Sequence, residues 1–246
     1  MKHNKVIAMP VYNRLDYTKQ VLDGIRSCYN SKDYKVIICV EPEQPVMIDM
    51  LSNYKHLDME IHQNEERLLT GGNVFKCLDI GFTYSDYVIL FEDDIVPSKD
   101  CLNYFEFCRH KFKDIKEILN ITGYCNRLHI KDFDIHIKED EYYKLRRLDW
   151  FTCWGWATWL DRWQELKKHW FTDKRDGNWT GKINNKFILE DKMYQIMPYL
   201  SRVQNIGFEN GVHKMEKIWY EYGQKTNYWI EDIGYDFRKG IYEYIE

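Results

Sequence analysis

The sequence predicts an α/β protein with a mixed, mostly parallel central sheet that is flanked by helices and folds as a single compact domain. Apolar runs alternate with segments of helical spacing, and short connections between them are typical of right-handed crossovers. The runs Lys5–Met9, Lys35–Val40 and Val88–Phe91 show no alternation of polar and apolar residues. Such runs indicate strands that are buried on both faces of a parallel sheet.

The first half of the chain supplies most of the expected strands and their crossover helices. Apolar residues at helical spacing, such as Val21, Leu22 and Ile25, indicate the helices. In chain order we expect a strand over Lys5–Met9 that Pro10 ends, a helix over Asp16–Ser27, a strand over Lys35–Val40, a helix over Met47–Tyr54, a strand over Met59–His62, a helix opened by Thr70–Asn73, and the strand over Val88–Phe91.

The second half is expected to complete the sheet and to carry more loops. It contains the most aromatic stretch of the chain, Leu148–Trp159. In chain order we expect a helix over Cys101–Phe112, a strand over Glu117–Thr122, loops or a hairpin over Lys131–Tyr143, a helix over Ala157–Leu166, a loop over Phe171–Asn185, a helix over Phe187–Met197, a strand over Ser201–Phe208 and a packed C-terminal tail.

Composition places the chain among ordinary globular proteins. Its 246 residues are 44% hydrophobic and 30% charged, which is enough for a sizeable core. The formal net charge of −4, without an arginine-rich run, gives no sign of a nucleic-acid-binding protein. We expect a nucleotide-binding half over residues 1–125 and an acceptor-binding half with a C-terminal cap over residues 126–246, which share one sheet.

The cysteines and the apolar runs bear on the compartment. Seven cysteines are scattered without a C-x-x-C pair, which favours buried free thiols in a reducing compartment over a zinc site. The N-terminus shows no signal-peptide pattern, and no apolar run approaches the roughly 20 residues that span a bilayer. We therefore expect a cytoplasmic protein, at most peripheral to the inner membrane.

Three consecutive acids, Glu92, Asp93 and Asp94, follow the strand Val88–Phe91. Ligands of open α/β sheets bind outside the carboxyl ends of the strands. Adjacent carboxylates repel each other and need a cation or hydrogen-bond donors. A hard divalent ion that holds a diphosphate through one or two carboxylates fits this position. The alternative is an acidic turn that caps the helix expected from near Ser98.

Five motifs in order resemble the glycosyltransferases of the GT-A fold: VIAMPVYNR, GGNV, ILFEDDIVPS, WGWATW and SRVQNIGFENGVH. The resemblance covers Lys5–His213. This stretch is similar to bacterial family-2-like sugar transferases and to the N-acetylglucosaminyltransferase of N-glycan branching. The resemblance implies a metal-dependent transfer of a sugar from a nucleotide diphosphate sugar, and it implies a UDP-linked donor. Neither the dinucleotide fingerprint nor a P-loop occurs in the sequence.

The resemblance implies a role for each acid. Asp94 would bind Mn²⁺ or Mg²⁺, and the ion would neutralise charge on the departing diphosphate. Glu92 and Asp93 would accept hydrogen bonds from ribose or sugar hydroxyls. His213 would be a second metal ligand, because imidazole binds Mn²⁺. The alternative for His213 is a loop histidine without a partner.

Other donor-binding residues follow from the same resemblance. Pro10 and Arg14 would contact the nucleotide after the first strand, Glu41 would hold uracil or ribose, and Arg67 would meet the diphosphate. The family more often has Asp where Glu41 stands. The alternatives are surface arginines at positions 14 and 67, and a turn acid before Pro42 at position 41.

The acceptor side needs a base that deprotonates the attacking hydroxyl. Leu-Glu-Asp at 189–191 resembles the Glu-Asp signature of family-2 transferases, so Asp191 is the expected base with Glu190 beside it, and inversion is expected. The alternative is a charge pair at a helix N-terminus. Trp154 and Gly155 are expected to line the sugar or acceptor site, because aromatic faces pack against sugar rings. Trp159 and Trp163 are expected to be core residues.

Two other functions are alternatives to that of a glycosyltransferase. A sugar nucleotidyltransferase usually carries a Gly-rich loop after its first strand, where this chain has MPVYNR. A non-catalytic nucleotide-sugar or carbohydrate-binding module would keep the fold and not turn over. The acceptor stays open between a glycan, a lipid-linked glycan and a hydroxylated DNA base. Nucleic acid is a partner only in the last case, which the acidity of the chain disfavours.

Overall fold

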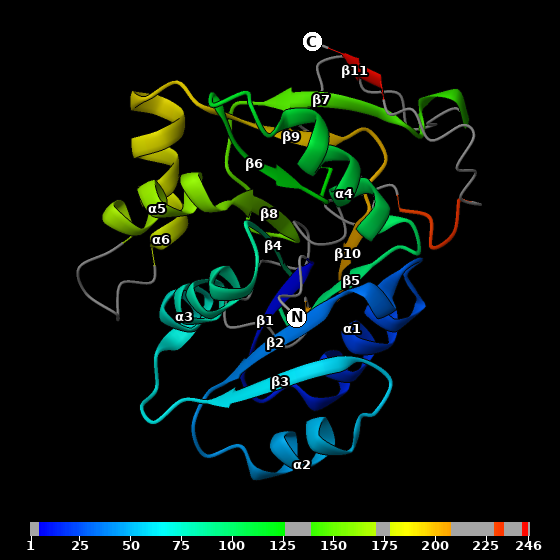
Figure 1. Ribbon diagram of the computed structural model, residues 1–246, viewed down its shortest axis with the longest axis vertical. Helices are drawn as coiled ribbons and strands as arrows, with labels where there is room; N and C mark the ends of the chain where they lie inside the picture. Colours follow the sequence, from blue (N-terminus) through cyan, green and yellow to red (C-terminus); the bar gives the residue numbers. More distant parts are fainter. Residues whose placement is uncertain (1–4, 126–138, 171–177, 208–228, 234–242, 246) are drawn as a thin grey trace, which may run out of the picture.

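A nine-stranded sheet runs through the part of the chain that the computed structural model describes, namely residues 5–125, 139–170, 178–207, 229–233 and 243–245. The strand order is β11-β7-β9-β6-β8-β4-β1-β2-β3 (Figure 1). The strands are β1 Val6–Val11, β2 Lys35–Val40, β3 Asp58–Gln63, β4 Tyr87–Leu90, β6 Ile118–Thr122, β7 Lys144–Leu148, β8 Trp156–Trp159, β9 Tyr194–Pro198 and β11 Glu243–Ile245.

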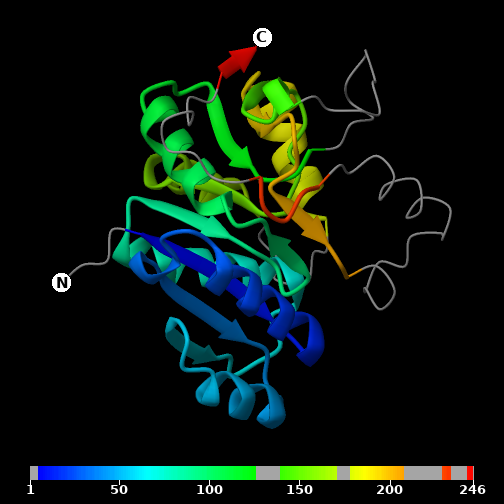
Figure 2. The ribbon, with the colours of Figure 1, turned by 90° about the vertical axis from the view of Figure 1, so that its right-hand side faces the viewer.

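Strand direction confirms a mixed, mostly parallel sheet. Strands β3, β2, β1 and β4 are mutually parallel. Strand β8 is antiparallel to both β4 and β6, and β6 is parallel to β9. Strands β1, β2, β3, β4, β6 and β9 therefore all end at the same edge of the sheet. Figure 2 shows the order along the long axis, from β3 and α2 at one end to β7 and β11 at the other.

Helices cover both faces of the sheet, as Figure 1 shows. Side chains of β1 alternate between two cores: Ile7 and Met9 pack with α1 and α4, whereas Val6 and Ala8 pack with α3 and α5. The helices are α1 Leu15–Ser27, α2 Pro45–Asn53, α3 Leu69–Tyr84, α4 Cys101–Phe112, α5 Leu160–His169 and α6 Trp179–Ile183, with short η1 Ser31–Asp33, η3 Glu139–Glu141 and the π-helix η4 Asn184–Glu190.

A small second sheet lies beside the carboxyl edge of the main sheet. Strand β5, Ile95–Pro97, pairs antiparallel with β10, Val203–Asn205. A buried ion pair anchors this sheet, with Arg202 Nε 2.6 Å from Asp100 Oδ2 and each side chain 1% exposed. The sequence indicated a strand near β10 but gave no sign of β5, which directly follows the three acids.

One helix prediction is wrong at its start and another over most of its length. The helix expected over Ala157–Leu166 is confirmed from Leu160 onward as α5. The Trp156–Trp159 segment is strand β8, in which Trp156 faces one core and Ala157 and Trp159 face the other. The apolar spacing of three fitted a helix, but both faces of a short central strand are buried, so spacing alone could not decide. The expected helix Phe187–Met197 is η4 as far as Glu190 and then strand β9.

Two smaller corrections concern the ends of elements. Strand β1 continues through Pro10 to Val11, and helix α6 occupies part of the loop expected over Phe171–Asn185. Most of Lys131–Tyr143 and of the C-terminal tail lies outside the described residues.

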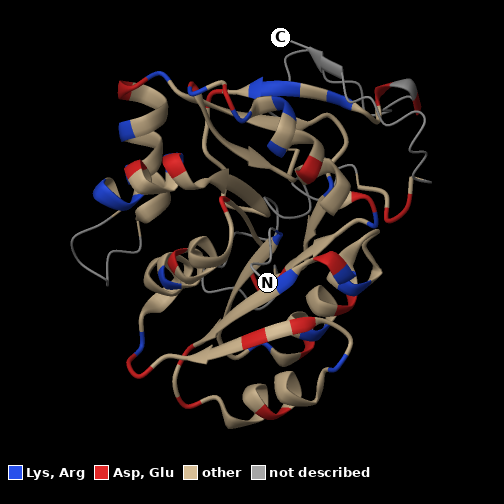
Figure 3. Cartoon of the chain, viewed as in Figure 1, with Lys and Arg blue, Asp and Glu red and all other residues tan. Residues whose placement is uncertain are grey.

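Charged residues of both signs occur along the described part of the chain. Figure 3 shows acidic residues on β3 and basic residues on β7, at opposite ends of the sheet. All seven cysteines are free thiols, and six of them are buried. Within the described residues, no helix has the length and apolar character that crossing a membrane requires.

Candidate active site

The three acids lie where β4 ends, at the edge that the parallel strands share. Phe91 extends the strand, its N–H donating to the Ala8 carbonyl at 3.1 Å. A turn follows, in which the Ile95 N–H donates to the Glu92 carbonyl at 3.1 Å. Asp93 and Asp94 are only 4% and 7% exposed, and Glu92 is half-buried. The carboxylates of Asp93 and Asp94, which follow the strand, are therefore buried in the protein rather than exposed to solvent.

Arg14 bridges the two buried acids from the loop after β1. Its Nη1 donates to Asp94 Oδ2 at 2.7 Å, and its Nη2 pairs with Asp93 Oδ1. The Tyr12 N–H also donates to Asp93 Oδ2 at 3.5 Å. Burial alone would lower the pKa of Arg14, but Asp93 and Asp94 more than offset this and raise it. The guanidinium therefore stays charged and serves as the internal counter-ion of the pair.

Burial also governs the protonation of the acids. It raises the pKa of Glu92 to about 8, with the Asp94 and Asp93 carboxylates adding to the effect and Arg14 opposing it. It raises the pKa of Asp93 to about 6, against the opposing effect of Arg14. One arginine does not fully neutralise three neighbouring carboxyls, so the cluster favours a further positive charge.

The chain after β10 passes directly over Asp94. The Ile206 N–H donates to the Asp94 carbonyl at 2.9 Å, and the Gly207 N–H donates to Asn205 Oδ1 at 2.9 Å. A Cβ atom at Gly207 would overlap Asp94 Oδ2. Only glycine therefore leaves this carboxylate in place, a requirement that the sequence alone did not reveal.

Asp94 offers one oxygen that fits a metal ion. Its Oδ1 is buried and accepts no hydrogen bond from the described residues. In the described part of the chain, no group of three or more His, Cys, Asp or Glu side chains is arranged to hold a metal. Mg²⁺ is nonetheless often held by one or two carboxylates and by substrate phosphates. The donor set therefore fits an ion that arrives with a diphosphate. His213 lies outside the described residues.

The remaining predicted donor residues lie on the β1–β2 side of the acids. Glu41 is 3% exposed and accepts the Leu68 N–H at 2.9 Å, so its carboxylate fixes the start of α3. The exposed Arg67 stacks over the ring of Tyr12 at 4.8 Å. Pro10 is buried within β1. The exposed Arg67 and the half-buried Tyr12 lie beside Asp93, whereas Glu41 and Pro10 are buried.

Gly155 brings the aromatic loop against the acids from the other side. Its φ is +56°, and a Cβ there would lie 2.8 Å from Val203 Cγ1, 3.2 Å from Ile95 Cγ2 and 3.4 Å from Phe91 Cδ1. Phe91 and Ile95 flank the three acids in the chain, so Gly155 touches both ends of the turn that holds them. Glycine is required here by backbone conformation and by space.

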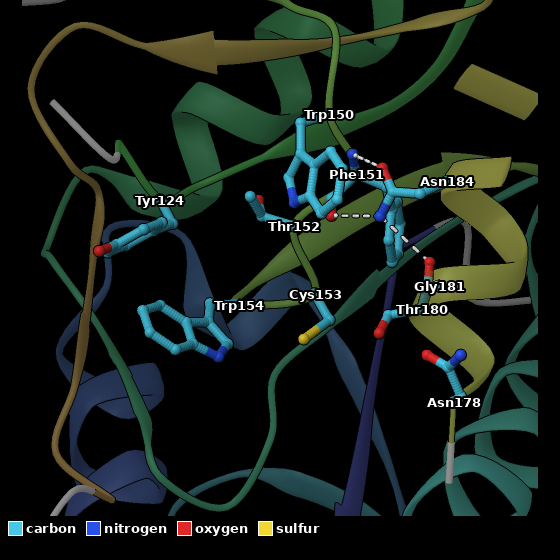
Figure 4. A pocket seen from close by; sticks show the side chains of 10 residues that line it. All are labelled: Tyr124, Trp150, Phe151, Thr152, Cys153, Trp154, Asn178, Thr180, Gly181 and Asn184. Carbon is cyan, nitrogen blue, oxygen red and sulfur yellow. Dashed lines mark hydrogen bonds between the residues drawn. The ribbon is translucent and has the colours of Figure 1, made fainter. Parts of the chain in front are cut away.

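A pocket of about 420 Å³ opens next to this glycine. Its walls are the loop Trp150–Trp154, the side chain of Tyr124 and the segment 178–184. Figure 4 shows Tyr124 and Trp154 on one side, with Cys153 in the centre. The rings of Tyr124 and Trp154 meet edge to face, with centroids 4.7 Å apart. Trp154 thus lines a cavity, as the sequence predicted for an aromatic residue at this point.

Asp191 and Glu190 are not brought to this site. Glu190 is the last residue of η4, and Asp191 follows it before β9 begins. Strand β9 runs parallel to β6 and hence to β4. Residues that precede β9 therefore lie at the opposite edge of the sheet from residues that follow β4. Both side chains pair with Lys186, Asp191 Oδ1 at 2.9 Å and Glu190 Oε2 at 3.4 Å. The geometry gives their assignment as base no support.

Solved structures with the same fold are glycosyltransferases. The mannosyltransferase PcManGT from Pyrobaculum calidifontis, in complex with GDP-Man and Mn²⁺, has a TM-score of 0.53 and 14% identity over 80% of this chain and 54% of that chain. S. aureus TarS 1–349 gives 0.55 and 10%, over 80% and 58%. Its complex with UDP-GlcNAc gives 0.54 and 13%, over 80% and 56%.

These likenesses show a shared fold and confirm the expected fold class. This chain spans little more than half the length of each of those structures. No protein-family model matches the sequence, and no curated protein matches it.

Proposed function

We propose that the protein is a metal-dependent glycosyltransferase that moves a sugar from a nucleotide diphosphate sugar to an acceptor hydroxyl. One observation carries the proposal: a buried carboxylate oxygen of Asp94, without a hydrogen-bond partner among the described residues, lies at the ligand-binding edge of the sheet, beside a pocket large enough for a sugar. The solved structures with this fold, which include complexes with GDP-Man and UDP-GlcNAc, support the class of donor.

On the donor side, Asp94 is the residue that would hold Mn²⁺ or Mg²⁺ together with the diphosphate. When bound, the ion supplies positive charge where the diphosphate departs. Glu92 and Asp93 are proposed to accept hydrogen bonds from donor hydroxyls. Arg14, released from the acids, and Arg67, on the Tyr12 ring, are proposed to bind phosphate oxygens, which suit a guanidinium fork. Residues 1–125 would form this donor half.

The acceptor half would comprise residues 126–246, with Trp154 and Gly155 lining the sugar site. His213 as a second metal ligand and inversion of configuration remain part of the proposal from the family resemblance. The family resemblance gives Asp191 as the base, but the direction of β9 puts that residue at the opposite edge of the sheet from Asp94, so the proposal assigns no base. The seven free thiols are consistent with a cytoplasmic enzyme, at most peripheral to the inner membrane.

The proposal is tested by incubating the protein with UDP- and GDP-sugars, with and without Mn²⁺, and measuring release of the nucleotide diphosphate. We expect release that requires the metal, and a loss of about 10²–10³-fold in Asp94→Asn, because a catalytic ion contributes several kcal/mol. Asp114→Asn, which changes an exposed acid away from the site, is the matched control. Binding of a nucleotide sugar without turnover, even with acceptors present, would indicate a binding module instead.

A further inference from the structure

The pocket beside Gly155 differs from the acid cluster in the described residues that line it. They include four aromatic side chains, and the rest are hydroxyl, amide, thiol or glycine groups. No lysine, arginine, aspartate or glutamate occurs among these described lining residues. We propose, building on the proposed function, that this pocket binds the acceptor and that the acceptor presents an uncharged sugar ring.

The aromatic part of the lining suits the apolar face of a sugar ring. Trp150 is 46% exposed, which is unusual for so large a side chain and leaves an indole face open at the pocket. Trp154 is half-buried and braced by Tyr124. Rigid aromatic faces of this kind bind a ring at low entropic cost because they have few rotatable bonds. Their positions around a 420 Å³ space fit one or two sugar units.

The polar part of the lining is neutral and well supported. Asn184 binds the backbone of Phe151 on both sides, accepting its N–H at 2.7 Å and donating to its carbonyl at 3.2 Å. It therefore fixes the loop to the start of η4. Thr180 lines the pocket with a hydroxyl, a group that both donates and accepts hydrogen bonds, as sugar hydroxyls do. The Thr152 hydroxyl is already engaged, because it donates to Thr122 Oγ1 at 3.1 Å and accepts from Gln195 Nε2 at 2.9 Å.

Negative charge near the pocket disfavours anionic ligands. The loop Trp150–Trp154 that lines the pocket leads into β8, and β8 pairs with β4, which the acids follow. Among the described lining residues, no cation would offset that charge for a phosphate or carboxylate. A nucleic-acid acceptor is disfavoured for the same reason, since its binding needs phosphate contacts from Lys and Arg.

Position separates this pocket from the donor. The nucleotide candidates Arg67 and Tyr12 lie on the β1–β2 side of the acids, whereas the pocket is built from residues next to β8 and α6 on the other side. The acids lie between them, which is where a transferred sugar must pass from donor to acceptor.

The test measures glycoside binding without any donor, by saturation-transfer NMR with methyl β-glucopyranoside, methyl β-galactopyranoside and methyl N-acetyl-β-glucosaminide. The charged counterpart is methyl β-glucopyranosiduronic acid. Trp150→Ala and Thr180→Val remove the open ring and the hydroxyl, and Leu189→Ala is the control because Leu189 is an exposed apolar residue outside the pocket. Circular dichroism checks that each variant is folded.

We expect at least one neutral glycoside to bind, with Kd raised about tenfold in Trp150→Ala and unchanged in Leu189→Ala. We expect the uronic acid to bind at least about tenfold more weakly. Absence of neutral binding, equal binding of the uronic acid, or indifference to both pocket variants would overturn the inference.

Donor hydrolysis is measured in parallel, so that the two proposals fail separately. Leu189→Ala, outside the pocket, should keep the wild-type KM for the nucleotide sugar when water is the acceptor. A donor KM raised in Trp150→Ala but not in Leu189→Ala would show that the pocket belongs to the donor sugar and would overturn the inference while leaving the transferase intact. If the wild type hydrolyses no nucleotide sugar, the transferase fails, and the glycoside titrations still decide what the pocket binds.

Discussion

The acid cluster and the aromatic pocket touch through Gly155 but are built in opposite ways. The cluster is buried, charged and held by Arg14 and by the backbone N–H groups of Tyr12 and Ile206. The described lining of the pocket is uncharged and is held by packing and amide hydrogen bonds. Under the proposed function, the difference assigns ionic contacts with a phosphate-bearing ligand to the cluster, and shape and hydroxyl matching of a neutral ligand to the pocket.

The largest expected difference between the two regions comes from Gly207→Ala. The new methyl group would overlap Asp94 Oδ2 and push that carboxylate aside. We expect Mn²⁺ affinity in the presence of UDP to fall about 10–100-fold, with glycoside binding unchanged. Isothermal titration measures both quantities.

The control for Gly207→Ala is Gly81→Ala, whose methyl group would crowd Val88 Cγ1 at 3.1 Å, near the start of β4 and away from the acids that follow its end. It should cost stability without changing metal affinity. A loss of metal affinity of the same size in both variants would mean that the effect is general destabilisation.

Arg14→Met should shift two affinities in opposite directions. Without the guanidinium, Asp93 and Asp94 lose their internal counter-ion, so Mn²⁺ alone should bind more tightly. UDP with Mn²⁺ should bind about tenfold more weakly if Arg14 also binds phosphate. Arg14→Lys keeps the charge but loses the fork and should fall between the two. Weaker binding of Mn²⁺ alone in Arg14→Met would contradict the counter-ion role.

The pH dependence should distinguish the charged region from the neutral one. The pKa of Glu92 is raised to about 8 and that of Asp93 to about 6, so the folded chain holds protons that the unfolded chain releases. Without metal, their contribution to stability is greatest below the unfolded pKa values near 4 and is lost as pH rises toward about 8.

A cation takes the place of those protons. The rise in Tm that Mn²⁺ causes should therefore be a few-fold larger at about pH 8 than at about pH 6. Glycoside binding should not change between these conditions. If Mn²⁺ raised Tm by an equal or smaller amount at the higher pH, the ion would not bind in place of the protons on Glu92 and Asp93.

The smallest effect is expected for Asp191→Asn. The sequence proposal of a catalytic base predicts lost transfer with intact nucleotide binding, whereas the direction of β9 predicts transfer within about twofold of wild type. We expect the second result in an assay of sugar transfer. Lost transfer with unchanged UDP affinity would support Asp191 as the catalytic base. The edge of the sheet at which β9 begins would then have to take part in the reaction.

Local pattern was enough for the elements that periodicity defines. Helix Cys101–Phe112 was predicted at its observed bounds, because its apolar spacing and its ends are encoded within the segment. The strands before the acids were recognised because a run buried on both faces has no polar residues. Because the acids directly follow such a strand, their position at the carboxyl edge of the sheet could be predicted from this pattern alone.

Features that depend on contacts between residues far apart in the chain could not be predicted from the sequence. The pairing of β5 with β10 joins residues about a hundred apart and involves only three residues on each strand, so no local pattern marks it. The fork of Arg14 and the contact of Gly207 with Asp94 are of the same kind. A short apolar run fits either a helix or a strand, so β9 was predicted as a helix. That error concealed the direction of β9, which places Asp191 at the opposite edge of the sheet from the acids.

The central claim is that Asp94 holds a cation together with a nucleotide diphosphate. Electron paramagnetic resonance of Mn²⁺, recorded with wild type and Asp94→Asn in the presence and absence of UDP, tests it directly. We predict a bound-ion signal that UDP strengthens in the wild type and that Asp94→Asn lacks. The same UDP-dependent signal in both proteins would contradict the claim.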